Sequence, residues 1–147
     1  MLDLIEQLTT RISNENEEAG LSPVSFRYGT MPELNVLADH LPDGLHVFHE
    51  GYFNTTPRIA GNGALLETHQ LVLFLFAPAS LSDLPEQKRE CLTLLTPLYR
   101  RLFVLLDKAG TVAGASANMN FSINITDRNL SGIRLALSLT PEGSVVC

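Results

Sequence analysis

The most constraining feature of the sequence is a strict alternation of apolar and polar side chains near its C-terminal end. Small apolar, Met, Phe and Ile residues occupy the odd positions from 115 to 125, and Ser, Asn and Thr occupy the even positions from 116 to 126. Because successive side chains of a strand point to opposite faces, this pattern predicts a strand with one face toward a core. A second alternating run follows the turn at 127–132, with its apolar side made of Ile133, Leu135, Leu137 and Leu139. The two runs predict a C-terminal β-hairpin.

Two other segments have the period of amphipathic helices. The first covers residues 2–18 and ends before Gly20. The second begins at 82 or 83 and runs to Lys108, with Gly110 closing it and apolar residues over about half of its circumference. A helix with one apolar half packs on a sheet, and Pro97 on the polar side is expected to bend it without opening the packed face.

Three further strands and a short helix are predicted between these helices. Residues 24–28 alternate as a strand, and a short helix is expected from Thr30 to Ala38, with Thr30 and Glu33 spaced as a capping box. A strand is expected from Leu45 to Phe53 with a bulge or bend at Gly51, and another from Leu65 to Phe76. Because the latter is continuously apolar from Leu71, it should be a central strand with both faces covered.

The predicted order is helix, strand, short helix, two strands, long helix and two strands. It indicates an α+β fold: a mainly antiparallel sheet of about five strands, with the N-terminal helix and the long helix packed on one face. A chain of 147 residues with 45% hydrophobic residues is expected to form one domain, 1–147.

Charge and composition exclude several function classes. The net charge is −6, and residues 1–50 hold nine acidic and two basic side chains, so specific nucleic-acid binding through a basic surface is not expected. The longest apolar stretch, 71–79, is too short to span a bilayer, and the N-terminus lacks the pattern of a secretory signal. Cys91 and Cys147 fit neither a zinc site nor a disulfide framework. An intracellular protein is expected.

The sequence shows no motif of a catalytic, metal or cofactor site, so we expect a protein that is not an enzyme and has no cofactor. His46 and His49 are three positions apart on a predicted strand, so their side chains should lie on opposite faces, partly exposed, and cannot share a metal. Cys91 falls on the apolar half of the long helix and is expected to be an inert core thiol.

Two sets of residues are candidates for contacts with other proteins. Residues 54–64 are either a mobile loop or the tip of a long hairpin arm. The segment 51–63 carries two aromatics and a Gly-rich end, which are typical of a segment that orders against a partner. The candidate partner-binding residues are Tyr52, Phe53, Asn54, Arg58 and Asn62. The uncharged face of the first strand of the C-terminal hairpin, which begins at 115, is expected to be covered by another subunit rather than exposed to water. The candidate interface residues are Ser116, Asn118, Asn120, Ser122 and Asn124.

The C-terminal hairpin contains the run Asp127-Arg128-Asn129-Leu130-Ser131-Gly132-Ile133-Arg134-Leu135-Ala136-Leu137, which resembles the end of small structural proteins encoded in bacterial prophages. The order of elements is also similar to that of phage tail-terminator, or tail-completion, proteins. This resemblance implies a ring of identical subunits that caps or connects the tail tube, contacts other phage structural proteins, and occurs in the bacterial cytoplasm or the assembled virion. An alternative with the same length and acidity is a peptide-binding module that resembles a secretion-chaperone dimer.

Overall fold

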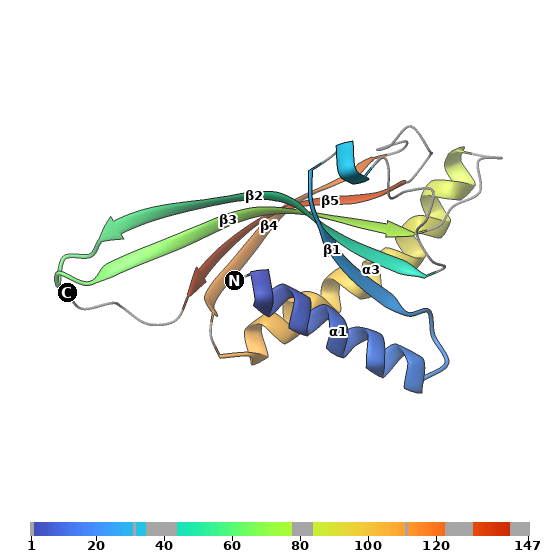
Figure 1. The fold of residues 1–147 in the computed structure, drawn as a ribbon, viewed down its shortest axis with the longest axis horizontal. Coiled ribbons are helices and arrows are strands. Elements are labelled where there is room, and N and C mark those ends of the chain that lie inside the picture. The colour runs from blue at the N-terminus through green and yellow to red at the C-terminus, as the bar shows by residue number, and fades with distance from the viewer. Residues whose placement is uncertain are drawn as a thin grey trace.

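The computed structural model describes residues 2–30, 32–34, 44–77, 84–110, 112–122 and 131–141, and the elements follow one another as predicted (Figure 1). They are α1 (Leu2–Glu18), β1 (Val24–Tyr28), β2 (Leu45–Ile59), β3 (Leu65–Ala77), α3 (Leu84–Lys108), β4 (Val112–Ser122) and β5 (Ser131–Pro141). Of the short helix expected from Thr30 to Ala38, residues 32–34 are helical and Thr30 is not, while 31 and 35–38 lie outside the described residues. The residues after Ser122 that were predicted to continue β4 also lie outside the described residues.

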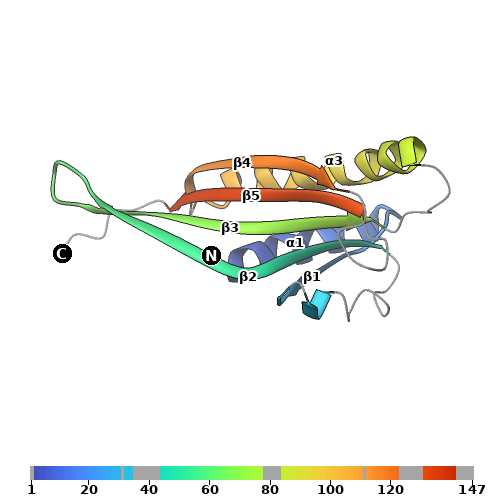
Figure 2. The same cartoon turned by 90° about the horizontal axis from the view of Figure 1, so that it is seen from above.

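The described strands form one five-stranded sheet in the order β1-β2-β3-β5-β4. β1 and β2 are parallel, and the other three neighbouring pairs are antiparallel, which makes the sheet mixed but mainly antiparallel, as expected. Both helices lie behind one face of the sheet (Figure 2). The predicted α+β class and the C-terminal hairpin are therefore confirmed.

The main core lies between the two helices and this face of the sheet. Its buried side chains come from α1, α3 and every described strand except β4, which adds the half-buried Ala117 and Phe121. The largest of its fully buried members are Ile5, Ile12, Leu73, Leu75, Leu95, Leu102, Leu106, Ile133 and Leu135. A smaller cluster on the opposite face joins Leu34, Phe48, Phe74 and Phe76, the last two with parallel rings 5.9 Å apart. Since β3 contributes to both clusters, its predicted central position is confirmed.

The two histidines of β2 differ in part from the expectation. His46 pairs with Phe76 and His49 with Leu73, which places them on opposite faces, as predicted. Their expected partial exposure is wrong, because both are buried, at 4% and 2% exposed. The reason is that β2 lies between β1 and β3, where apolar side chains cover both faces of the sheet.

Local polar contacts fix the chain around β1. The backbone N–H of Thr30 donates to Glu33 Oε2 at 2.5 Å and its hydroxyl donates to the same atom at 3.1 Å, so the predicted pairing of these residues forms. Both hydrogen bonds lower the pKa of the Glu33 carboxyl, and the one from the Thr30 backbone has the larger effect. At the bulge predicted in β2, the pairing with β3 shifts register between His49 and Phe53.

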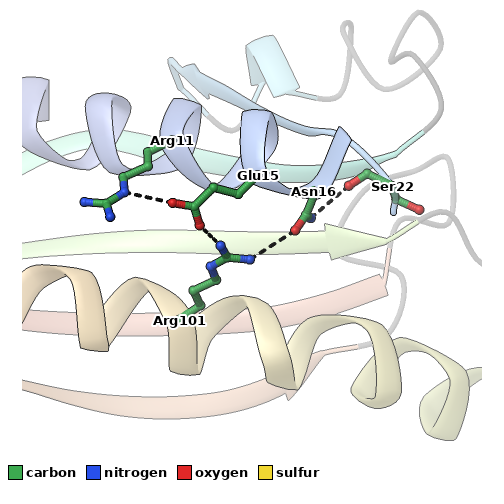
Figure 3. Close-up of polar contacts among 5 residues, drawn as sticks. All are labelled: Arg11, Glu15, Asn16, Ser22 and Arg101. Atoms are coloured by element: carbon green, nitrogen blue, oxygen red, sulfur yellow. Dashed lines mark hydrogen bonds and ion pairs between the residues drawn. The ribbon is translucent and has the colours of Figure 1, made fainter. Parts of the chain in front are cut away.

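A polar bridge between the helices was not predicted (Figure 3). Arg101 of α3 pairs with the Glu15 carboxylate of α1 and donates to Asn16 Oδ1 at 3.3 Å. Glu15 also accepts from Arg11 Nε at 2.9 Å, and Asn16 donates to the Ser22 carbonyl at 2.9 Å. Glu15 and Arg101 come together because α1 and α3 lie side by side.

Candidate functional site

The most distinctive feature is a hairpin arm, formed by β2 and β3 beyond the bulge, that projects past both helices (Figures 1 and 2). Strand pairing continues from Phe53 opposite Leu71 to Ile59 opposite Leu65. Residues 60–64 make the turn, in which Ala60 N–H donates to the Ala64 carbonyl at 2.8 Å and Gly63 has a φ of +82° that suits glycine. Of the two possibilities left open by the sequence, the segment is thus a hairpin arm and not a loop.

The five candidate partner residues do not form one patch. Phe53 is 43% exposed and stacks on His69 with ring centroids 5.0 Å apart, on the face that continues the helix side of the sheet. Asn54 and Arg58 alternate onto the other face, where Asn54 donates to Gln70 Oε1 at 3.4 Å. Asn62 stabilises the turn, because its Oδ1 accepts from Ala64 N–H at 3.1 Å. The side chain of Tyr52 is outside the described residues.

The arm ends on an exposed aliphatic residue that was not among the candidates. Ile59 is 74% exposed, the highest value among the large hydrophobic side chains of the described residues. It occupies the last paired position before the turn, next to the exposed Arg58. The position of Ile59 beside the Gly-rich tip was the one sequence feature that pointed to its exposure. It was not decisive, because a single Ile in a strand is more often buried.

The candidate subunit interface lies along β4, at one edge of the sheet. Ser116, Asn118 and Asn120 are exposed and lie on the face opposite the helices. The backbone of Ser122 belongs to the same strand, but its side chain is outside the described residues, and Asn124 lies wholly outside them. The structure therefore brings three of the five predicted residues together as an exposed neutral row.

A shallow hollow of about 370 Å³ adjoins this row at the base of the arm. The side chains that line it on this face of the sheet are uncharged: Gln70, Val72, Ser116, Asn118, Ala136 and Ser138. Farther along the strands, Asn120 lies opposite the half-buried Arg134 of β5. The neutral surface thus ends at a positive charge.

A second hollow, of about 280 Å³, lies between the end of α1 and the middle of α3. Its apolar lining consists of Ile12, Leu21, Leu45, Leu94, Pro97 and Leu98. Leu21 and Leu94 are 61% and 38% exposed, so part of this apolar surface faces water. Sequence periodicity does not reveal such a site, because it is assembled from segments far apart in the chain.

The described residues contain no group of three or more His, Cys, Asp and Glu side chains placed to hold a metal ion. Burial, with a smaller effect of Glu90, raises the pKa of the Cys91 thiol, and this side chain is 1% exposed. Among the helices of the described part, none has the length and apolarity needed to cross a membrane.

Neither the protein-family models nor the curated proteins give a match to this chain.

Proposed function

We propose that this chain is a non-enzymatic assembly protein of a prophage particle, which forms a ring of identical subunits that terminates or connects the tail tube. The observation that carries the proposal is the exposed neutral edge of the sheet, β4. As a ring component it would act in the bacterial cytoplasm or in the assembled virion, with itself and other phage structural proteins as partners.

An open edge strand is a template for pairing with another chain, and proteins that stay monomeric usually block it with Lys, Pro or inward-pointing charge. The eleven residues of β4 include no charged residue and no proline. A register shift between Val112 and Gly114 is confined to the start of the strand. The exposed Ser and Asn side chains can hydrogen-bond across a subunit contact without the desolvation cost of a charge.

Two further features support assembly of the tail-terminator kind. The sheet carries a long projecting hairpin between an N-terminal helix and a packed helix, followed by closing strands, which is the element order that suggested this class. The acidic excess in residues 1–50 would repel DNA, as suits a ring through which DNA passes.

Light scattering coupled to size-exclusion chromatography tests the proposal. The wild-type protein is expected to form a closed oligomer larger than a dimer at high micromolar concentration. Asn118→Arg places a charge on the exposed row of β4 and should yield monomers. Gln7→Arg, a substitution at an exposed position on α1, is the matched control and should leave the oligomer intact.

A wild-type protein that stays monomeric at high micromolar concentration would overturn the proposal. A closed dimer that binds an extended client peptide would instead favour the chaperone-like module. Images of rings by negative-stain electron microscopy would support the ring directly.

A further inference from the structure

We propose that the arm of one copy inserts Ile59 into the apolar hollow between α1 and α3 of the next copy. This inference rests on the proposed self-assembly and names the surfaces that one contact would use. It makes the contact head-to-tail, because the donor surface and the acceptor surface differ.

The donor is the exposed end of the arm. Ile59 is 74% exposed and stands where the arm has left the cover of the helices. Moving such a side chain out of water is favourable, because its apolar surface no longer contacts solvent. A single chain keeps this apolar surface in solvent, so its burial by a second copy stabilises the contact.

The acceptor is an apolar hollow with exposed walls. Its volume is about 280 Å³, and Leu21 and Leu94 present aliphatic surface to solvent beside it. An isoleucine side chain needs an apolar recess of limited depth and no hydrogen-bond partner. The hollow meets this need, because three polar side chains of its lining already have partners: Asn16 donates to the Ser22 carbonyl, Thr93 donates to the Arg89 carbonyl, and Arg101 pairs with Glu15.

The charges of the two surfaces are complementary. Arg58 adjoins Ile59, and residues 58–64 at the tip of the arm contain no other charged side chain. The hollow lies at the C-terminal end of α1, where Glu17 and Glu18 are exposed and the last turn contains no basic residue. Because the C-terminal end of a helix carries partial negative charge, this region favours an incoming cation.

The occupant must come from another molecule. In Figure 1 the arm extends away from the body on the side opposite the C-terminal end of α1, so a chain cannot place its own tip in its own hollow. A head-to-tail contact of this kind repeats from copy to copy and gives a ring when the rotation between copies closes.

Mixed cysteine variants test the contact. In a Cys147→Ser background, Ile59→Cys protein is mixed with Leu94→Cys protein under mild oxidation. A covalent dimer linking the two variants is expected, because residue 59 of one chain would lie against residue 94 of the other. Thr56→Cys, an exposed arm position before the tip, is the matched control and should give little cross-linked dimer with Leu94→Cys.

Light scattering on the same proteins separates this inference from the proposed function. Ile59→Asp should weaken association by roughly tenfold or more, as expected for loss of one buried aliphatic side chain, while Thr56→Asp should not. Arg58→Glu should also weaken it, and Glu17→Lys with Glu18→Lys in the same chain should restore it. An assembled wild-type protein that gives no preferential cross-link and tolerates Ile59→Asp would overturn the inference alone. A wild-type monomer would overturn both.

Discussion

Gly132 of β5 occupies a position in the sheet that no larger residue can fill. It lies between Phe76 of β3 and Ser122 of β4, and a Cβ atom added there would overlap the backbone carbonyl of Leu75. Because the obstacle is backbone, side-chain rotation cannot relieve it. The glycine thus allows β3 and β5 to pair at the edge of the core.

Gly132→Ala is therefore expected to destabilise the protein by about 3 kcal/mol, the upper part of the range for overpacked cores. Gly114→Ala in β4 is the matched control, since nothing lies within 4 Å of the added methyl group. It should be neutral or slightly stabilising. Urea unfolding followed by circular dichroism measures both, and equal stabilities of the two variants would contradict the prediction.

For single residues, the sequence predicted on which face of the sheet a side chain lies better than it predicted whether that side chain is exposed to solvent. The opposite orientations of His46 and His49 follow from the period of a strand, which is local. Their burial depends on neighbours that are distant in sequence, the core side chains on the helix face of the sheet and the cluster of Leu34, Phe74 and Phe76 on the other face. For the same reason, no local pattern could predict that Arg101 pairs with Glu15 of another helix.

The contact between α1 and α3 depends on one guanidinium group that bridges two elements. Arg101 holds both Glu15 and Asn16, and the side chains of Arg101 and Glu15 are 37% and 34% exposed. Solvent therefore screens the pair, and its contribution should be modest. The bridge orients the two helices more than it stabilises the fold.

A double-mutant cycle with Arg101→Met and Glu15→Gln should give a coupling free energy of about 0.5–1 kcal/mol that decreases at high salt. Arg11→Met with Glu15→Gln is the internal comparison, because that pair lies within α1 and should couple by roughly 0.3–0.5 kcal/mol. Thermal or urea unfolding provides the values. A coupling near zero for Arg101 and Glu15 would show that the bridge does not stabilise the helix pair.

At the scale of elements, long periodic segments were the most predictable. The bounds of α1 and β1 agree with the prediction, because both have a clear period and a stop signal. β2 extends to Ile59, six residues past the predicted end at Phe53. Its continuation contains Pro57 and two threonines and resembles a loop, but in a two-stranded arm one side of each strand is open, where proline is tolerated.

The molecule as a whole has two parts: a body, in which the helices and the sheet enclose the apolar core, and the hairpin arm, which has no apolar core of its own. Among residues 55–69 only Ala64 is buried, so the arm adds little to the stability of the body. The apolar clusters and both helices lie outside this segment. Assembly and folding should therefore be separable.

Replacing residues 55–69 with Asn-Gly joins Asn54 to Gln70, which already face each other across the hairpin. The shortened protein should keep its helical circular dichroism and a melting temperature within about 5 °C of the wild type. It should also lose the assembly proposed for the intact chain. Loss of cooperative unfolding would contradict the separation of arm and body.

The order of strands in the sheet also has a consequence for how the protein is made. β5 lies between β3 and β4 although it follows both in the chain. While a ribosome is still extending the polypeptide through β4, the space beside β3 stays unfilled, and β4 has no strand to pair with. Closure of the sheet must wait until residues 131–141 emerge from the exit tunnel. The nascent chain therefore exposes apolar surface until β5 has emerged, and chaperones can capture such a surface in the meantime.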